Sequence, residues 1–167
     1  MKILIPTLGR MDKQLTYNNL PDKWKAETIF VVQHHEGEQM KKRFPDNEVI
    51  VLDYSYKTIT PTRTFIMNEM RNRGERYWSP DDDLQFGYRE PNKDPSIDKK
   101  WFGRELTDRD FDDMFMTMNL FMDDGIVHGG LATTWTIPNL DCWPVAKNSR
   151  VMTNHWFDPQ QIPSDVV

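Results

Sequence analysis

The stretch that decides the fold is Arg76–Leu84, which reads RYWSPDDDL. It joins a short aromatic run, Arg76–Trp78, to three consecutive carboxylates, Asp81, Asp82 and Asp83. Aromatic runs of this kind are typical of strands. Acidic side chains directly after such a strand lie where open parallel sheets bind their ligands, at the strand carboxyl ends. The stretch therefore predicts a strand of an α/β sheet and the place of a functional site.

Three further runs of β-branched and apolar residues precede this stretch: Lys2–Ile5, Thr28–Gln33 and Glu48–Asp53. Each is nearly continuous in apolar character, as strands covered on both faces require. They alternate with helical segments, and this alternation predicts an α/β fold with a mainly parallel (mixed) sheet flanked by helices. Two later runs, Ile126–Thr136 and Arg150–Phe157, are expected to add strands on either side of a turn region at Ile137–Asn148.

Two helices are predicted from their end signals and their apolar spacing. The first is expected to have Thr60 as its N-cap, Pro61 at its first position and Gly74 at its end. The second is expected to begin at Thr107 and to stop at Gly125. Their predicted buried stripes are Phe65, Ile66, Met67 and Met70 in the first helix, and Phe111, Met114, Phe115, Met118, Phe121 and Met122 in the second.

Length and composition favour one domain with a hydrophobic core, because 167 residues include 6 Trp, 9 Phe and 10 Met. Cys142 is the only cysteine, which excludes an internal disulfide and a multi-cysteine zinc site. No apolar stretch is long enough to cross a bilayer and no leader precedes the first strand, so we expect a cytoplasmic protein without membrane contact. The net charge of −5, concentrated in the second half, argues against non-specific binding to nucleic acid.

The acidic triplet is a candidate metal site. If the chain stays extended there, Asp81 and Asp83 face the same way and Asp82 points elsewhere. Mg²⁺ and Mn²⁺ take such carboxylates together with phosphate oxygens and waters, and they neutralise charge on a departing diphosphate. The alternative is a solvated acidic turn, or a helix cap after Pro80.

Further candidate residues lie at the ends of the neighbouring strands. Pro6, Thr7 and Arg10 follow the first strand, and Arg63 lies near the start of the first helix, where its charge gains nothing from the helix dipole. A guanidinium can hold a phosphate, although an ordinary surface role is open for Arg10.

The second strand is followed by further polar residues, among which Gln33 and Glu36 could contact a nucleobase. The adjacent His34 and His35 do not have metal-pair spacing, and His128 and His155 are assigned structural roles. The long segment Gly87–Arg104, rich in Pro, Lys and Asp, predicts a loop beside the triplet.

The sequence lacks a serine nucleophile elbow, a phosphate-loop lysine and a glycine-rich dinucleotide motif. Its pieces instead resemble the GT-A class of glycosyltransferases: an opening Ile5–Thr7 strand end, the Thr62-Arg63 helix entry, a strand, and then Asp81–Leu84. The resemblance covers residues 1–86 best.

The resemblance implies a GT-A-like nucleotide-binding fold, a nucleotide-diphosphate sugar donor, with UDP favoured, and Mn²⁺ or Mg²⁺. It implies that Asp83 binds the metal, that Asp81 faces metal or ribose, and that Arg10 and Arg63 face the nucleotide. Together with the strand-end residues above, the predicted metal ligands are Asp81 and Asp83, and the predicted donor nucleotide site is Pro6, Thr7, Arg10, Gln33, Glu36, Arg63, Asp81 and Asp82. On this interpretation residues 1–86 form the donor nucleotide-binding half, 87–106 a loop and 107–167 the acceptor-side half of a single domain, residues 1–167.

The sequence is also similar to phage-associated transferases that decorate hydroxymethylated pyrimidines in DNA. This likeness rests on Ile5–Arg10, Val49–Leu52 and Arg150–Asp158. It makes modified phage DNA a candidate acceptor and the host cytoplasm the location, while a protein, lipid or small-molecule acceptor stays open. Contacts to the duplex would then come from the first half or from the basic residues Lys93, Lys99, Lys100 and Arg104.

One departure from the GT-A pattern leaves the catalytic residue unassigned. That class carries a late Glu-Asp pair before a helix, whereas this chain has lone acids only, at Asp124, Asp141, Asp158 and Asp165. The departure is consistent with a domain truncated at its C-terminus. Two alternatives to a glycosyltransferase therefore stay open, a sugar-phosphate nucleotidyltransferase and a non-catalytic nucleotide-binding fragment.

Overall fold

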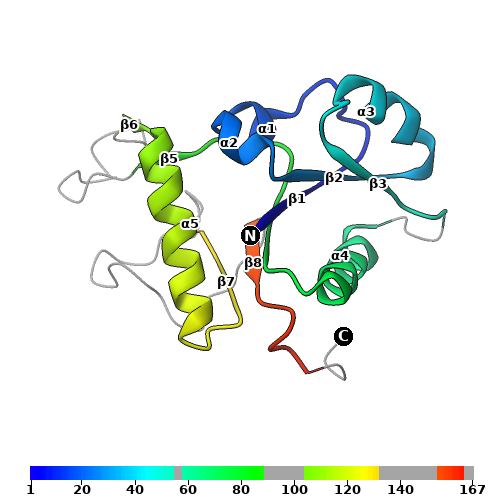
Figure 1. Ribbon diagram of the computed structural model, residues 1–167. Helices are drawn as coiled ribbons and strands as arrows, with labels where there is room; N and C mark the ends of the chain where they lie inside the picture. The colour runs from blue at the N-terminus through cyan, green and yellow to red at the C-terminus, as the bar shows by residue number, and fades with distance from the viewer. Residues whose placement is uncertain (55–57, 89–103, 132–153, 164–167) are drawn as a thin grey trace, which may run out of the picture.

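The computed structural model describes residues 1–54, 58–88, 104–131 and 154–163. Its centre is a six-stranded sheet in the order β3-β2-β1-β4-β8-β7 (Figure 1). The strands are β1 (Lys2–Thr7), β2 (Thr28–Val32), β3 (Glu48–Val51), β4 (Tyr77–Pro80), β7 (His128–Gly130) and β8 (Asn154–Phe157). Both halves of the chain thus contribute to one sheet.

The first four strands are parallel, and the chain changes direction across the sheet at β1. From β1 it moves outward to β2 and β3, and it then returns to place β4 on the other side of β1. In open α/β sheets such a reversal leaves a crevice at the carboxyl ends of the two central strands. Here these ends are Thr7 of β1 and Pro80 of β4.

The other strands are antiparallel to their neighbours. Asn154 of β8 pairs with Pro80, so β8 begins at the same edge of the sheet at which β4 ends. The edge strand β7 pairs with β8, and His128 lies opposite Phe157. A separate two-stranded sheet joins β5 (Gly87–Tyr88) to β6 (Arg104–Glu105). The sheet is therefore mixed but mostly parallel, as predicted.

Helices cover both faces of the sheet, with α4 and α5 on opposite sides (Figure 1). The helices are α1 (Leu15–Asn18), α2 (Asp22–Lys25), α3 (Gly37–Arg43), α4 (Ile59–Arg73), α5 (Asp108–Asp123) and the short 3₁₀ helix η1 (His34–Glu36). Phe111, Phe115, Met118 and Met122 of α5 pack with Trp78 and Trp156 on one face. Ile66 and Met70 of α4 pack with Tyr77 on the other.

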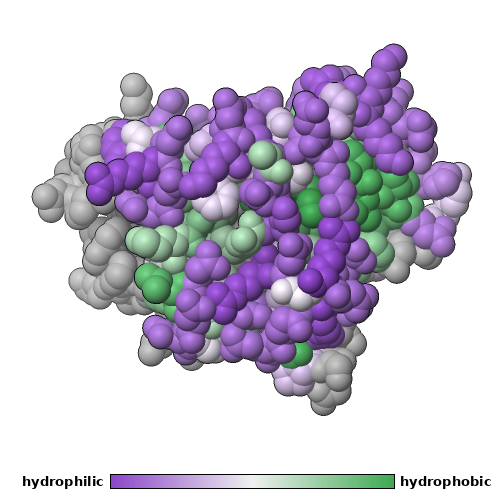
Figure 2. Space-filling view, in the orientation of Figure 1, coloured by the Kyte–Doolittle hydropathy of each residue, from purple (hydrophilic) through white to green (hydrophobic). Residues whose placement is uncertain are grey.

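Apolar surface on the viewed side is confined to limited areas among hydrophilic residues, and one area lies over β2 and β3 (Figure 2). The edge strand β3 is only partly buried. Within the described part of the chain, no helix has the length and apolar character needed to cross a membrane.

The predicted strands and the second helix are confirmed where the structure describes them. Helix α5 starts after Thr107, whose side chain forms a capping box with Asp110, and it ends before Gly125, whose φ is 82°. The turn region 137–148, Cys142, and most of the predicted loop at 87–104 lie outside the described residues.

The predicted start of the first helix is wrong by two residues. The N-cap of α4 is Thr58, not Thr60, and its side chain makes no capping hydrogen bond. Pro61 is therefore the third helical residue. A proline is tolerated there because the first four N–H groups of a helix have no intrahelical partner in any case. Arg63 consequently lies just beyond the first turn.

Candidate functional site

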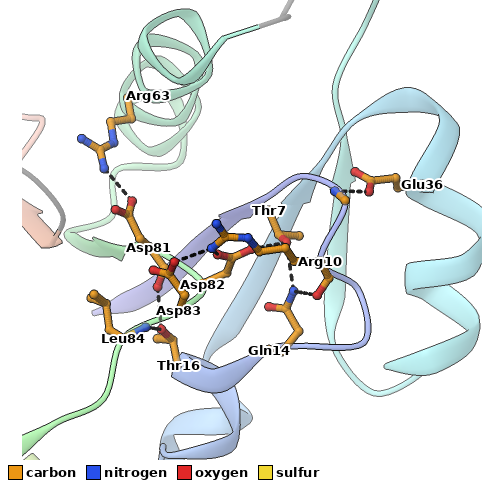
Figure 3. Close-up of polar contacts among 11 residues, drawn as sticks. Thr7, Arg10, Gln14, Thr16, Glu36, Arg63, Asp81, Asp82, Asp83 and Leu84 are labelled. Carbon is orange, nitrogen blue, oxygen red and sulfur yellow. Dashed lines mark hydrogen bonds and ion pairs between the residues drawn. The ribbon is translucent and has the colours of Figure 1, made fainter.

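The acidic run lies at the crevice between β1 and β4. The three aspartates Asp81–Asp83 follow β4 directly. Next to them lie Thr7, the last residue of β1, and Arg10, which follows that strand (Figure 3). The sheet topology alone produces this juxtaposition, because the two strands are neighbours although about 70 residues separate them. The carboxyl ends of these two strands therefore bring together carboxylates, a hydroxyl and a guanidinium.

Asp82 is the buried member of the run, at 6% exposure. Its Oδ2 accepts a hydrogen bond from Thr7 Oγ1 at 2.5 Å, and its Oδ1 accepts one from Arg10 at 3.1 Å. Gln14, which is also buried, donates to Thr7 Oγ1 at 2.9 Å and to the carbonyl oxygen of Arg10 at 3.0 Å. A buried carboxylate requires such partners. Asp82 thereby fastens the loop after β1 to the turn after β4.

Asp83 is more open, with 53% of its side chain exposed, and it also contacts Arg10 through a short ion pair. The expectation of an extended run is wrong, although Asp83 is close enough to Asp81 for its charge to add to the effect of burial in raising the pKa of Asp81. Residues 82 and 83 form a turn, so Asp82 and Asp83 share Arg10 while Asp81 points toward a different arginine.

Asp81 accepts a hydrogen bond from Arg63 of α4 at 2.8 Å (Figure 3). Burial raises the pKa of Asp81 above its ordinary value, and the Arg63 guanidinium offsets part of that rise. Arg63 also contacts Nε2 of His155 on β8 at 3.1 Å. The run thus divides between two cations, Arg10 on one side and Arg63 on the other.

Thr16 fixes the backbone of the acidic run, a role that sequence reasoning missed. Its Oγ1 donates to the carbonyl oxygen of Asp81 at 2.5 Å and accepts from the N–H of Leu84 at 2.8 Å, and its own N–H donates to the carbonyl oxygen of Asp82 at 3.1 Å. The residue is fully buried in the short helix α1. No local signal distinguishes it from other threonines, because its partners are distant in sequence.

The predicted nucleobase contacts lie beyond the ends of β1 and β2. Glu36 is buried at 2% exposure, and its Oε1 accepts from the N–H of Gly9 at 2.6 Å. Gly9 adopts a φ of 68°, which favours glycine. Gln33 is half-buried beside the exposed His34 and His35, and Pro6 is buried in β1 opposite Val31. The buried Glu36 Oε2, Gln14 Oε1 and Ser79 Oγ atoms have no hydrogen-bond partner among the described residues.

The residues present suit a divalent cation that also binds phosphate. Asp81 and Asp83 keep 30% and 53% of their side chains exposed, whereas Asp82 is held by Thr7 and Arg10. Carboxylate oxygens are the ligands of Mg²⁺ and Mn²⁺, which need only one or two of them beside substrate phosphates. In the part of the chain that the structure describes, no group of three or more His, Cys, Asp or Glu side chains could hold a metal alone.

The lone acids of the second half have other surroundings. Asp158 is buried, accepts from Arg76 at 2.9 Å and caps the backbone N–H of Gln160. Asp124 is the exposed C-cap of α5. Asp141 and Asp165 lie outside the described residues. The structure therefore gives Asp158 a packing role and leaves the catalytic base unassigned.

The comparison with family models matches residues 1–154 to the TET-associated glycosyltransferases. The chain belongs to the TET-associated glycosyltransferase family. It is therefore a glycosyltransferase, and this membership implies a nucleotide-sugar donor. No curated protein and no solved structure matches the chain. The match extends well past residue 86, so β7 belongs to the family region together with the acidic run, and the match ends at Asn154, the first residue of β8.

Proposed function

We propose that this TET-associated glycosyltransferase moves a sugar from a nucleoside diphosphate, UDP above all, to an acceptor hydroxyl with the help of Mn²⁺ or Mg²⁺. The observation that carries the proposal is the acidic run Asp81–Asp83 at the β1–β4 crevice, flanked by Arg10 and Arg63. Asp81 and Asp83 would hold the metal, and the two arginines would face the diphosphate in a GT-A-like arrangement.

The proposed role of each site residue follows from its charge and its exposure. A divalent cation bound here supplies Lewis-acid stabilisation of the departing diphosphate. Arg10 and Arg63 each offer several N–H donors in a plane that matches phosphate oxygens. Asp82, which is buried and fully bonded to Thr7 and Arg10, holds the turn that presents its neighbours. Preorganised charges of this kind are a major source of catalysis in leaving-group chemistry.

A hydroxymethylated pyrimidine in DNA is the acceptor that we propose. Its exocyclic CH₂–OH group offers the hydroxyl oxygen that would attack the anomeric carbon, while the hydroxyl proton passes to a base and the nucleoside diphosphate leaves. The proposal is supported by the likeness to phage-associated transferases and by the association with TET in the family's name. Glycosyltransferase membership disfavours the nucleotidyltransferase and the non-catalytic alternatives.

The donor site is tested by thermal melting with UDP, GDP and CDP, each with and without Mn²⁺. Bound ligand raises the melting temperature by mass action, so we expect a Mn²⁺-dependent rise with UDP. Asp83→Asn should remove this rise without unfolding the protein, because Asp83 is exposed. Asp46→Asn, an exposed position between α3 and β3, is the matched control. No rise with any nucleotide would overturn the proposed donor site.

The acceptor is tested separately with duplex and single-stranded DNA that contains 5-hydroxymethyl pyrimidines. Incubation with UDP-sugars and Mn²⁺ should add the mass of one hexose or related sugar per modified base, as measured by mass spectrometry of the digested DNA. Unmodified DNA should gain nothing, since it lacks the hydroxymethyl oxygen. Donor hydrolysis without any transfer to these oligonucleotides would exclude this acceptor and retain the donor site.

A further inference from the structure

A chain of polar side chains runs from the edge of the sheet to the acidic run. His128 on β7 contacts His155 on β8, with 3.0 Å between His128 Nε2 and His155 Nδ1. His155 Nε2 lies 3.1 Å from a terminal nitrogen of Arg63, whose other terminal nitrogen donates to Asp81 at 2.8 Å. The chain thus joins two antiparallel strands, helix α4 and the turn after β4.

The proton positions in this chain are determined by its arginine. A guanidinium has donors and no acceptor, so Nε2 of His155 must accept from Arg63. The His155 ring then carries its proton on Nδ1, and that N–H donates to Nε2 of His128. His128 in turn accepts at Nε2, so its own proton lies on Nδ1. The contacts therefore require two neutral rings, each in the Nδ1–H form.

The rings are also held in place by packing. His128 stacks on Phe157 with a centroid distance of 4.4 Å and an interplanar angle of 6°, and it stacks on His155 at 5.3 Å. Phe157 stacks in turn on the buried Tyr77 of β4. A half-turn flip of either ring would keep the plane of the ring but would replace a bonded nitrogen by carbon, so the contacts to Arg63 and between the two rings fix which nitrogen faces each partner. The pair consequently presents one acceptor atom, His155 Nε2, at a fixed place beside Arg63.

We propose that His155 and His128 are positioning residues that orient the Arg63 guanidinium for the donor diphosphate, and that they do so only while both rings are neutral. The inference deepens the proposed function and rests on it for the identity of the ligand. Arg63 lies between a carboxylate and an imidazole acceptor, so its plane is directed by two partners. Protonation of either ring removes an acceptor atom and places a second positive charge close to Arg63.

The surroundings of the pair in the described chain fix the direction of its pH dependence. The titratable and charged groups nearby are Arg63 from α4 and, at β4 and its end, Tyr77 and Asp81. Burial raises the pKa of Tyr77, so it stays neutral. Arg71 of α4 is engaged elsewhere, at the carbonyl oxygens of Pro159 and Ile162. Partial burial lowers the pKa of His128. The neutral form of His128 is therefore favoured at neutral pH, and acidification through its lowered pKa opposes that form.

The first test needs no ligand. Nitrogen-15 chemical shifts of the histidine side chains report which ring nitrogen carries the proton. We expect the Nδ1–H form for His155 and His128 at pH 7.5, in contrast to the exposed His34 and His35, which should show mainly the Nε2–H form that predominates in free histidine. An Nε2–H form at His155 would overturn the inference and leave the proposed function intact.

The second test measures affinity for UDP with Mn²⁺ by calorimetry between pH 5.5 and 8. His155→Gln places an amide oxygen near the Nε2 position and cannot be protonated in this range. It should bind within about twofold of the native protein at pH 7.5, and its affinity should fall less on acidification. His155→Leu removes the acceptor and should bind about tenfold more weakly than the native protein at pH 7.5, with a smaller difference at pH 5.5, where protonation removes the same acceptor from the native ring. His35→Gln is the control and should match the native protein throughout.

Folding is checked by melting each variant, and His128→Phe provides a second route if His155→Leu unfolds. This replacement retains an aromatic ring to stack on Phe157 and removes the acceptor of the His155 Nδ1–H. It should weaken UDP binding several-fold. Native affinity and an unchanged pH profile in both His128→Phe and His155→Gln would overturn the inference. Absence of UDP binding by the native protein would instead overturn the proposed donor.

Discussion

Asp82 shows how one residue of an acidic run can be structural while its neighbours remain open to ligands. One of its oxygens accepts a hydrogen bond from Thr7 at the end of β1, the other accepts one from Arg10 after β1, and the side chain is 8% exposed. An isolated buried carboxylate is unfavourable, so this arrangement persists because Thr7 and Arg10 are in place. The run is thereby anchored at its middle residue.

The first prediction concerns Asp82→Asn. The carboxylate has two acceptor oxygens, whereas the amide of asparagine has only one. Either Thr7 or Arg10 would therefore lose its acceptor. We expect a loss of about 1–3 kcal/mol in the free energy of unfolding, measured by urea denaturation. Asp46→Asn, on the exposed surface, should change it by less than about 0.5 kcal/mol. Equal stability of the two variants would show that the Asp82 contacts contribute nothing net.

The second prediction concerns the titration of Asp81. Burial raises its pKa and Arg63 lowers it, so Arg63→Met should raise it further. The pKa of Asp81 is higher in the folded protein than in the unfolded chain, where it is about 3.9. Its contribution to stability is therefore fully present below about pH 3.9 and is lost as the pH rises through the folded pKa. The variant should therefore lose more stability than the native protein across this window.

Carbon-13 shifts of the Asp81 carboxyl during acid titration measure this pKa directly. Arg73→Met is the matched control, because Arg73 lies on the same helix but pairs with Glu48 and Glu69. The control should leave the Asp81 titration in its native range. A lower Asp81 pKa in Arg63→Met would contradict the assignment of Arg63 as its stabilising cation.

Individual site residues were predictable from sequence when they lay next to a strand end. Arg10 and the acidic triplet fall into this group, because strand ends in a parallel sheet share an edge. Thr16 and His155 do not. Their roles depend on partners that are distant in sequence, such as Arg63, and nothing in their immediate sequence marks them. The geometry of the triplet also escaped prediction, because the turn at 82–83 is fixed by Arg10 and Thr16 rather than by local propensity.

At the scale of elements, the antiparallel strands β7 and β8 pack unusually closely around a glycine. Gly129 lies opposite Trp156, and a Cβ added to it would lie only 2.1 Å from the nearest ring carbon of Trp156. The absence of a side chain therefore allows the indole to lie over β7 and to join the core on the α5 face. The same strand carries His128, so the position of that ring depends on this packing.

The third prediction is that Gly129→Ala destabilises the protein by about 1–3 kcal/mol, because the core has no room for the added methyl group. Hydrogen exchange should locate the loss at β7 and β8. Combining it with Trp156→Leu should cost less than the two separate changes together, since the smaller side chain makes room for the methyl group. Simple additivity of the two would contradict a direct contact as the cause.

Elements with continuous apolar runs or clear end signals were predicted well. The four parallel strands and α5, with Thr107 and Gly125 at its ends, agree with the structure. The start of α4 was not predicted correctly, because Thr58, Thr60 and Thr62 all resemble N-caps and Pro61 is tolerated at several early helix positions. The sheet order could be limited by handedness rules, yet the insertion of β8 beside β4 had no sequence signal.

At the scale of the whole molecule, charge is the property that bears most on a nucleic-acid acceptor. The chain has 21 basic and 26 acidic residues, a formal net charge of −5. Arg104, one of the basic residues suggested for duplex contacts, pairs with Asp110 in two hydrogen bonds. A protein with this excess of acidic residues gains little binding free energy from the release of counterions from DNA.

The fourth prediction is therefore that unmodified duplex DNA binds weakly. We expect a Kd no tighter than about 10⁻⁶ M at physiological salt, and a shallow dependence of log K on log salt. Fluorescence anisotropy over a salt series measures both. A steep slope would reveal many phosphate contacts and would contradict the prediction. If the slope is shallow as expected, selection of the acceptor rests on the modified base itself rather than on the backbone.

The order in which the strands follow along the chain has a consequence for biosynthesis. β4 carries the acidic run, but its neighbour β8 comes from residues 154–157 and follows every other strand in the described part of the chain. While a ribosome is still making the intervening residues, β4 presents an unpaired edge that can join other chains. The site itself is finished last, when β8 brings His155 to Arg63. Ribosome-bound chains that lack β8 should accordingly hold the carboxylates in place before the arginine beside them has its imidazole partner.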